Sequence, residues 1–471
     1  MKYYCWIVLM ALLPKLLPAQ DSTRVLTQEV YFQWIQAHHP LVRQANLLTA
    51  AAEANLLSAR GGFDPKLISE VSQKSFDGKN YYTLTESGFK IPTWYGLEVK
   101  GLFNSASGIN INPENTLPAA GQAVLGVKAT LGQGLFIDER RATLQKARLL
   151  KNANEAARLN AINDVLLDAA IAYWDWAKAY GEWLAIGQAL QVSRQRLEGI
   201  VQGYLQGDRP AIDTLEAFLQ VQNWTYERNE AWLNYRNTGA RLSNFLWYEA
   251  DTPLEIVESV RPPLPDTTAH FQPLPGMENF IQAAQTQHPQ LQTYQFKLAQ
   301  LNIDRRLALE GLKPKLDLEY NLLGNGLRFD PDNGGNGLEN LLFQNFKWGL
   351  SFSFPLFLRK ERGKLELTRL YIADTDLAVQ QKRLEIVNKV REAYREWENT
   401  QQQIALYESI AANYQRLLEA ENERFRLGES SIFLINAREQ KLIEAQLKLV
   451  SLRADFQKGR VKTSWAAGRV N

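Results

Sequence analysis

The octapeptide GLFIDERR at residues 134–141 decides the fold, because a similar octapeptide, PLFLRKER, returns at residues 355–362. In each copy the internal phenylalanine is followed 71 residues later by a glycine, in the pairs Phe136/Gly207 and Phe357/Gly428. Sequence repeats of this length build one shared structure from similar units. We therefore predict an internal two-fold repeat.

Each octapeptide opens a long stretch of strong helix formers (Ala, Leu, Glu, Lys, Gln and Arg) that lacks proline. The first stretch runs from Phe136 to Arg209, and the second runs from Leu356, directly after Pro355, to residue 471. Seventy helical residues rise about 105 Å, too far for a compact globule, so we predict a rod of helices. The second stretch carries a packing stripe that is apolar until its last member: Leu406, Ile410, Tyr414, Leu417 and Glu421.

A tight turn is predicted where each long helix ends. Gly428 suits a left-handed helix cap, and Ser430 or Ser431 can cap the helix that follows. Gly207 is followed by Pro210, which suits a first helical turn. Each long helix and its return helix then form a coiled-coil hairpin.

Between the helices lie strands with strict alternation of apolar and polar residues. The segments 316–322 and 346–354 alternate in this way, with a Gly-, Asn- and Asp-rich loop at 324–340 between them. Aromatic-rich alternation is typical of outer-membrane barrel strands, whereas the alternative is a water-soluble sheet with one buried face. The matching region of the first copy is 28 residues longer. Whether its extra hairpin joins the same wall stays open.

Oligomerisation follows from the number of strands. Four to six strands cannot close a barrel, because about eight is the practical minimum. Open sheet edges are not tolerated in lipid. Several copies must therefore pool their strands.

Residues 1–20 form a predicted cleaved signal peptide, with Lys2 before an apolar core and Leu17-Pro18-Ala19 before the cleavage site. The one cysteine, Cys5, lies inside it, which excludes disulfide and thiolate chemistry in the mature chain. The remaining 51 basic and 51 acidic residues balance and suggest no nucleic-acid surface. The mature sequence has no run of about 20 apolar residues for a helical membrane span.

Catalytic motifs are missing from the sequence: it has no nucleophile motif, phosphate-binding glycine loop or Rossmann fingerprint. His38, His39 and His288 stand beside prolines that open helices, and His270 lies in a linker. No cysteine or paired His-Glu spacing accompanies them, so structural positions are expected rather than metal ligands. We predict no enzyme, no metal and no cofactor.

The predicted α+β organisation has two structural repeats. After the signal peptide, the first repeat spans 21–260, a Pro-rich linker spans 261–275, and the second repeat spans 276–471. The first repeat has short helices, strands at about 66–132, a long helix at about 135–206 and a return helix at about 210–248. The second has a helix at about 289–310, strands at about 315–355, a long helix at about 357–427 and a return helix at about 431–466.

The duplicated helix–strand–helix plan, the 71-residue spacing and the two turn motifs (Gly207 to Asp213 and Arg426 to Ser430) resemble the TolC-type outer membrane efflux protein family. The resemblance covers nearly the whole mature chain. It implies a homotrimer with one shared barrel in the bacterial outer membrane and a helical conduit in the periplasm. It also implies a periplasmic adaptor protein and an inner-membrane pump as partners.

The resemblance assigns roles to residues at the hairpin turns. The positions expected to contact the adaptor are Gly207, Asp208, Arg426, Leu427, Gly428, Glu429 and Ser430. The positions expected to gate the tip are Tyr204, Arg209, Asp213 and Phe425. This chain departs from the family pattern in the second repeat, where Ser430, Leu434 and Ala437 replace a base and two carboxylates, so no acidic selectivity ring is expected.

The function expected from these observations is transport through an outer-membrane duct. The duct is the exit of a tripartite efflux or type I secretion system and passively exports small molecules or polypeptide. The alternative is a periplasmic coiled-coil adaptor or scaffold without a pore. The sequence leaves the cargo, the pump and the adaptor open.

Overall fold

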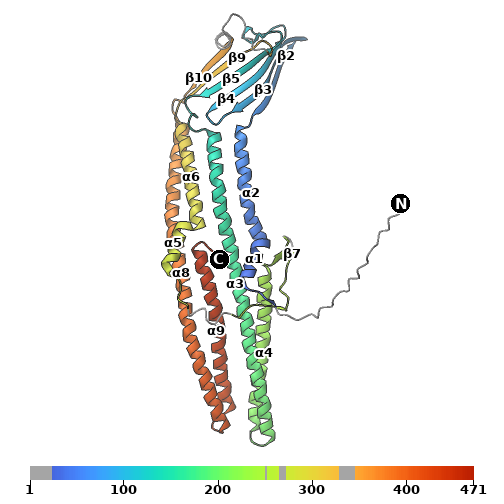
Figure 1. Cartoon of the computed structure of the whole chain (residues 1–471), viewed down its shortest axis with the longest axis vertical. Coiled ribbons are helices and arrows are strands. Elements are labelled where there is room, and N and C mark those ends of the chain that lie inside the picture. Colours follow the sequence, from blue (N-terminus) through green and yellow to red (C-terminus); the bar gives the residue numbers. More distant parts are fainter. Residues whose placement is uncertain (1–23, 250–251, 265–271, 328–344, 471) are drawn as a thin grey trace, which may run out of the picture. The chain divides into compact units, whose positions relative to one another are not determined.

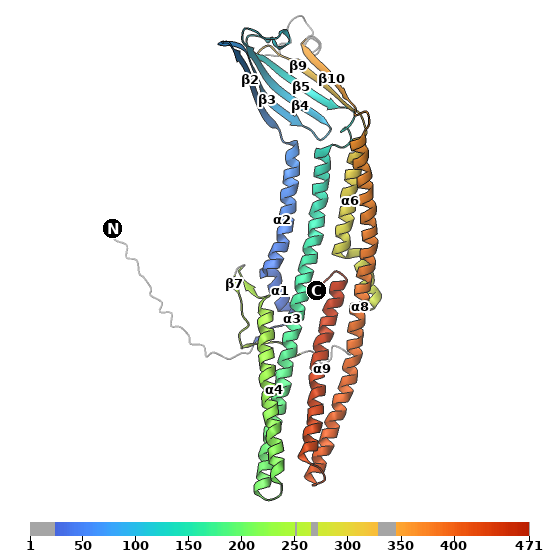
Figure 2. The same cartoon turned by 180° about the vertical axis from the view of Figure 1, so that it is seen from behind.

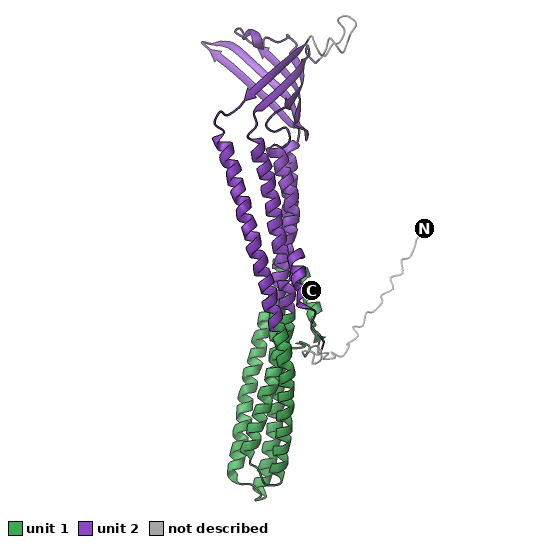
Figure 3. Ribbon diagram, turned by 90° about the vertical axis from the view of Figure 1, so that its left-hand side faces the viewer, with its two compact units in different colours: residues 1–40, 168–274, 397–460 green, residues 41–167, 275–396, 461–471 purple. Residues whose placement is uncertain are grey.

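The computed structural model describes residues 24–249, 252–264, 272–327 and 345–470. The predicted signal peptide lies outside the described residues, as do the centre of the Pro-rich linker and most of the loop expected at 324–340. The chain divides into two compact units (Figure 3). The hairpin unit comprises residues 1–40, 168–274 and 397–460, and the sheet unit comprises residues 41–167, 275–396 and 461–471.

Two antiparallel helical hairpins dominate the hairpin unit, one from α3 and α4 and the other from α8 and α9 (Figures 1 and 2). Their helices span Glu139–Leu205 (α3), Ala211–Ser243 (α4), Arg359–Arg426 (α8) and Ile432–Ala466 (α9). The short helix α1 (Gln28–His38) belongs to the same unit, to which α3 and α8 contribute their C-terminal parts. Between Phe136 and Pro210, the absence of proline permits one unbroken helix.

Short strands of the hairpin unit were not predicted. Arg24–Val25 (β1) pairs in parallel with Val260–Arg261 (β8), and Trp247–Tyr248 (β6) pairs with Thr252–Pro253 (β7). The first return helix was expected to reach about residue 248, but α4 ends at Ser243. The prediction ran too far because Trp247 and Tyr248 pair as a strand.

Alanines let the helices of the hairpin unit approach closely. On α3, Ala169, Ala170 and Ala177 are fully buried beside the rings of Tyr173 and Trp176. The Tyr173 ring stacks on Tyr31 of α1 at 5.5 Å, and its hydroxyl donates a 2.7 Å hydrogen bond to the Leu26 carbonyl. This segment of α3 is therefore a core helix.

The sheet unit is built around a six-stranded sheet in the order β10-β9-β5-β4-β3-β2, with every neighbouring pair antiparallel (Figures 1 and 2). The strands span Lys66–Phe76 (β2), Lys79–Pro92 (β3), Leu97–Ser107 (β4), Gln122–Thr130 (β5), Lys315–Leu323 (β9) and Phe346–Ser353 (β10). The longer region of the first copy thus supplies four strands to the same sheet. The single turns η1 (Gly61–Phe63) and η2 (Pro113–Asn115) lie in the same region of the chain.

The strand register separates apolar from polar side chains. Across β9 and β10, Trp348 lies opposite Tyr320 and Phe352 opposite Leu316, so these side chains share one face. The other face carries polar pairs, because Lys100 of β4 forms an ion pair with Glu319 of β9. The sheet therefore has one apolar face and one charged face.

The helices of the sheet unit are α2 (Pro40–Arg60), α5 (Met277–Gln287), α6 (Pro289–Glu310) and the N-terminal parts of α3 and α8. Ala59 and Phe63 pack against Leu144 of α3, which joins α2 to α3. Ile303 packs against Ala142, which joins α6 to α3. None of the helices in the described residues has the length and hydrophobicity needed to cross a membrane.

The two His-Pro pairs mark helix junctions. His288 is buried, and its Nδ1 accepts a 3.2 Å hydrogen bond from the Gln290 amide, which caps α6. Burial and the nearby charges of Lys389 and Lys382 lower the pKa of His288 to about 4. His39 is also buried, stacks on Phe245 at 5.7 Å, and has its pKa lowered mainly by burial.

The pKa of His288 predicts acid sensitivity of the sheet unit. As the pH falls from 6.5 towards 4, the unfolded chain binds a proton at His288 while the folded chain does not. The free energy of unfolding therefore falls by about 3 kcal/mol across this window and stays constant above it. Urea unfolding between pH 4 and 8, followed by circular dichroism, measures the slope.

The matched control is His288→Asn, which retains a side-chain acceptor for the Gln290 amide but does not titrate. We expect the slope to shrink in this variant. Equal slopes in the two proteins would show that another group causes the acid sensitivity.

Candidate functional site

Both hairpin turns of the hairpin unit close in the same way. Gly207 has φ +82° and Gly428 has φ +79°, a left-handed conformation that strains residues with a side chain. After α3, the amide of Gly207 donates to the Tyr204 carbonyl at 3.0 Å and that of Asp208 donates to Gly203 at 2.9 Å. The amides of Gly428 and Glu429 donate to Phe425 and Arg424 in the same pattern. These are Schellman caps, which satisfy the last carbonyls of each long helix.

The return helices begin differently. Pro210 is the N-cap residue of α4, and no side chain caps this end of the helix. The sequence had suggested Pro210 for the first helical turn, which begins one residue later at Ala211. At α9 the Ser431 hydroxyl accepts a 3.4 Å hydrogen bond from the Leu434 amide. Ser430 instead donates a 2.6 Å hydrogen bond to Oε1 of Glu421. Of the two serines, Ser431 caps the helix and Ser430 fixes the turn to α8.

Arg209 and Phe425 connect the two hairpins. The guanidinium carbon of Arg209 lies 3.9 Å from the centroid of the Phe425 ring, and Nη2 donates a 3.3 Å hydrogen bond to the Phe425 carbonyl. The ring packs against two clusters of buried residues, one with Ile200 and Ile432 and the other with Ile435. A cation over a partly buried ring contributes about 0.5–2 kcal/mol. We call this contact the Arg209–Phe425 latch.

The other two candidate gate residues make local backbone contacts. The Tyr204 carbonyl accepts from Gly207, and the Asp213 amide donates a 3.1 Å hydrogen bond to the Pro210 carbonyl. Asp213 lies in the first turn of α4, where a carboxylate complements the helix dipole. Arg209 and Phe425 thus contact each other, whereas Tyr204 and Asp213 make these hydrogen bonds within their own hairpin.

Charged residues of the second turn are mostly exposed. Arg426 pairs with Glu423 at 2.9 Å, and the Glu429 carbonyl accepts a 3.3 Å hydrogen bond from Arg424. Exposed pairs of this kind stabilise a fold little. Leu205 and Leu427 project from the two turns and are 70% and 73% exposed. The turns therefore offer both charges and apolar side chains to a partner.

A buried carboxylate behind the second turn was not predicted as a site residue. Glu421 is 5% exposed and accepts the Ser430 hydroxyl, with Arg438 at 3.6 Å and Arg424 at 3.8 Å. The Ser430 hydrogen bond and these two arginines lower the pKa of Glu421. A signal existed in the sequence, because Glu421 interrupts the apolar stripe that begins at Leu406.

A second buried carboxylate ties α3 to α9. Arg196 forms a two-pronged ion pair with Glu439 at 2.7 and 2.8 Å and also donates to Asn436 at 3.2 Å. Glu439 is only 3% exposed. Planar guanidinium–carboxylate pairing fixes direction as well as distance. The two hairpins are thereby held in one register near their turns.

No metal-binding group of three or more His, Cys, Asp or Glu side chains occurs within the described ranges. The polar residues at the turns can hold neighbouring helices or a protein partner. Their chemistry is that of ion pairs and hydrogen bonds.

Sequence comparison identifies the family to which this arrangement corresponds. Residues 280–465 match the family model described as outer membrane efflux protein. The chain contains an outer membrane efflux protein domain. Over residues 280–465 this match agrees with the predicted family resemblance, and with a transport protein of the outer membrane rather than an enzyme. Among curated protein sequences, no match is found.

Solved structures of outer membrane channels share the fold. The CmeC channel of Campylobacter jejuni is 15% identical, with 94% of this chain and 85% of that chain covered and a TM-score of 0.62. VceC of Vibrio cholerae is 13% identical, with coverage of 94% and 96% and a TM-score of 0.62. The open MtrE channel of Neisseria gonorrhoeae is 13% identical, with coverage of 94% and 88% and a TM-score of 0.63. The likeness of fold extends over 94% of the chain.

Replacing either turn glycine by alanine is expected to destabilise the hairpin unit by about 1 kcal/mol, because φ is positive at both positions. The control is Gly199→Ala inside α3, where the added methyl meets open space and raises helix propensity. Urea unfolding monitored by circular dichroism compares the variants. Gly207→Ala as stable as Gly199→Ala would contradict the turn assignment.

Breaking the buried ion pair has a larger expected effect. Arg196→Met leaves the Glu439 carboxylate buried without its partner and is expected to cost about 3–5 kcal/mol. The double variant Arg196→Met/Glu439→Met removes both charges and is expected to recover most of that loss. The exposed pair serves as control, since Arg426→Met is expected to change stability by less than about 1 kcal/mol. Additive losses in the double variant would refute direct coupling.

Proposed function

We propose that this chain is the outer-membrane exit duct of a tripartite efflux or type I secretion system. It passively exports small molecules or polypeptide that an inner-membrane pump delivers through a periplasmic adaptor. The duct is a homotrimer built from the two structural repeats, 21–260 and 276–471, with the linker 261–275 between them. The cargo is selected mainly by the pump.

The two-faced sheet is the observation that carries this proposal. Trp348 and Phe352 are 60% and 68% exposed, and Leu350 between them is exposed on the same face. Lipid or a protein partner normally covers a contiguous apolar surface of this kind. The opposite face carries the ion pairs Lys100–Glu319 and Lys128–Asp317, the latter at 3.2 Å. Apolar outside and charged inside is the pattern of a water-filled barrel wall.

The sheet edges support a shared barrel. β2 and β10 terminate the six-stranded order, and each has one neighbour in the sheet. In lipid an open edge would leave backbone groups without hydrogen-bond partners. Three copies would contribute 18 strands, six from each chain, which is enough for a barrel with an aqueous channel. Pairing β2 of one copy with β10 of the next closes the ring.

The hairpin unit supplies the periplasmic end of the duct. The exposed turns present Leu205 and Leu427 together with charges, which suits contact with the adaptor. We assign this contact to the positions Gly207, Asp208, Arg426, Leu427, Gly428, Glu429 and Ser430. In this assignment, the two glycines set the turn geometry and the remaining residues meet the partner.

The Arg209–Phe425 latch serves as a gate element of the closed tip. It joins the first hairpin turn to the end of α8 through one half-buried contact at 3.9 Å. Tyr204 and Asp213 complete the candidate gate on the α3–α4 hairpin. An adaptor that binds the turns more tightly in the open arrangement shifts the equilibrium towards it.

Native mass spectrometry of the protein extracted in detergent from outer membranes tests the assembly. A trimer that also gives channels in planar lipid bilayers is the expected result. A monomer in the soluble periplasmic fraction would overturn the duct and favour a scaffold without a pore.

Weakening the latch is expected to open the tip. Arg209→Gln removes the cation and Phe425→Leu removes the ring, and each should raise single-channel conductance or open probability about twofold or more. Arg426→Gln is the control, because Arg426 belongs to an exposed pair of the same tip. If Arg426→Gln opens the channel as far as Arg209→Gln does, general loss of positive charge explains the effect.

A further inference from the structure

A row of lysines crosses the charged face of the six-stranded sheet. The strand register aligns one lysine from each of four strands: Lys66 of β2, Lys90 of β3, Lys100 of β4 and Lys347 of β10. Gly126 of β5 and Asn321 of β9 complete the same row. Neighbouring strands lie about 4.8 Å apart, so the row extends about 24 Å across the sheet. We call it the lysine row.

The stability of the sheet does not account for the lysine row. Lys66 lies opposite Lys90, and Lys90 lies opposite Lys100. Like charges directly opposite each other on neighbouring strands are destabilising. Among the described residues, Lys100 forms an ion pair with Glu319, whereas Lys66, Lys90 and Lys347 form none. Lys66 and Lys347 are exposed and Lys90 is half-buried.

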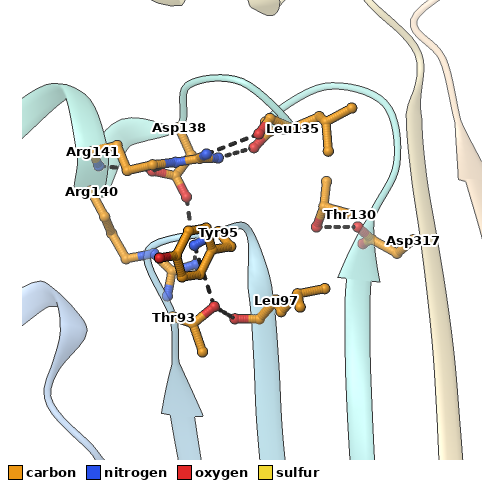
Figure 4. A network of polar contacts seen from close by, with 10 residues as sticks. Thr93, Tyr95, Leu97, Thr130, Leu135, Asp138, Arg140, Arg141 and Asp317 are labelled. Atoms are coloured by element: carbon orange, nitrogen blue, oxygen red, sulfur yellow. Dashed lines mark hydrogen bonds and ion pairs between the residues drawn. The ribbon is translucent and has the colours of Figure 1, made fainter.

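Carboxylates of β9 beside the row are already bound within the sheet. Glu319 is paired with Lys100. Asp317 accepts a 2.9 Å hydrogen bond from the Thr130 hydroxyl (Figure 4) and pairs with Lys128 at 3.2 Å. These two carboxylates therefore do not neutralise the remaining lysines of the row.

Charge is segregated on this face of the sheet. In the lysine row and the cross-strand rows through Glu319, Asp317 and Lys315, lysines of the strands outnumber carboxylates. The lysines are Lys66, Lys90, Lys100, Lys128, Lys315 and Lys347, and the carboxylates are Glu98, Asp317 and Glu319. On the other side of the lysine row, an apolar row (Ile68, Leu102, Val124 and Leu323) separates it from Glu70, which lies opposite Glu86 at the β2 edge. The excess positive charge is thus confined to one part of the face.

An excess of lysines on a water-facing wall raises the local concentration of anions. Rings of lysine or arginine side chains give pores a preference for anions. The strands of an outer-membrane barrel are tilted by about 35–45°, so the lysine row would climb the wall as an inclined stripe. A permeating ion would pass the lysines of one stripe in succession.

We propose that the lysine row makes the channel prefer anions, and that the exported cargo includes negatively charged molecules. This inference rests on the proposed function, because it names the class of cargo that the duct carries. Lys66, Lys90 and Lys347 supply the preference through ammonium groups without a carboxylate partner in the described part of the chain. Lys100 instead joins β4 to β9.

Reversal potentials in planar lipid bilayers under a KCl gradient test the proposal. The wild type is expected to pass chloride about threefold or more in preference to potassium. Lys66→Gln/Lys90→Gln is expected to lower this permeability ratio about twofold. The matched control is Lys74→Gln/Lys79→Gln, which removes the same charge from the same two strands at the β2–β3 turn. The control is expected to keep the ratio of the wild type.

The variant Lys347→Gln tests whether strands from both parts of the sequence act as one row. It is expected to lower the ratio in the same direction, and the triple variant of Lys66, Lys90 and Lys347 should approach equal permeability. The preference should also be weaker in 1 M than in 0.1 M KCl, because the Debye length falls from about 10 Å to about 3 Å. No chloride preference in the wild type, or an equal loss in the Lys74→Gln/Lys79→Gln control, would overturn the proposal.

Calorimetry of inorganic tripolyphosphate with the full-length protein in detergent at low salt distinguishes this proposal from the duct. Lys66→Gln/Lys90→Gln is expected to bind about tenfold more weakly than the wild type, because two charge-assisted contacts are lost. A conducting protein with neither chloride preference nor lysine-dependent binding refutes the lysine row and leaves the duct intact. Lysine-dependent binding by a protein that never conducts supports the row as an anion-attracting surface and refutes the duct. Circular dichroism confirms that each variant is folded.

Discussion

Burial of α3 on nearly all sides is the constraint on which the hairpin unit depends. Alanines of this helix let neighbouring backbones come close, and Tyr173 and Trp176 fill the remaining space. A helix with apolar side chains around its circumference must be surrounded by other elements. The short helix α1 is therefore part of the core, since its side chains Tyr31 and Ile35 are fully buried. This also explains why Tyr173 is bonded to the chain before α1.

Much of this architecture follows from local sequence patterns. Helix formers without proline predict the long helices, and the helix expected at about 135–206 spans Glu139–Leu205 in the structure. Alternation of apolar and polar residues predicts the strands, because successive side chains of a strand point to opposite faces of the sheet. The two-residue strands were missed because pairing between Arg24 and Val260 is set by packing, with too few residues for a pattern.

Some of the functional residues could be predicted from the sequence, and others could not. The turn glycines could be predicted because a backbone with positive φ favours glycine. The ion pair between Arg196 and Glu439 could not be predicted from the sequence, because 243 positions separate the two residues. Glu421 is an intermediate case: its place in an apolar stripe marked it as unusual, but only the fold shows that Ser430 satisfies it. The family resemblance pointed to Arg209 and Phe425 as separate gate positions, whereas only the structure shows that the two side chains are in contact.

The sheet has a consequence for how the chain reaches its native state. Its central pairing joins β5 to β9, and within it the Thr130 hydroxyl bonds to Asp317 across 187 positions of sequence. Loop closure over such a distance must precede any gain from the pairing, which slows folding. Strands β2 to β5 leave the ribosome long before β9 and expose unpaired apolar edges in the interval. The six-stranded sheet can therefore be completed only after β9 and β10 have been synthesised, and β5 lacks its neighbour in the sheet until then.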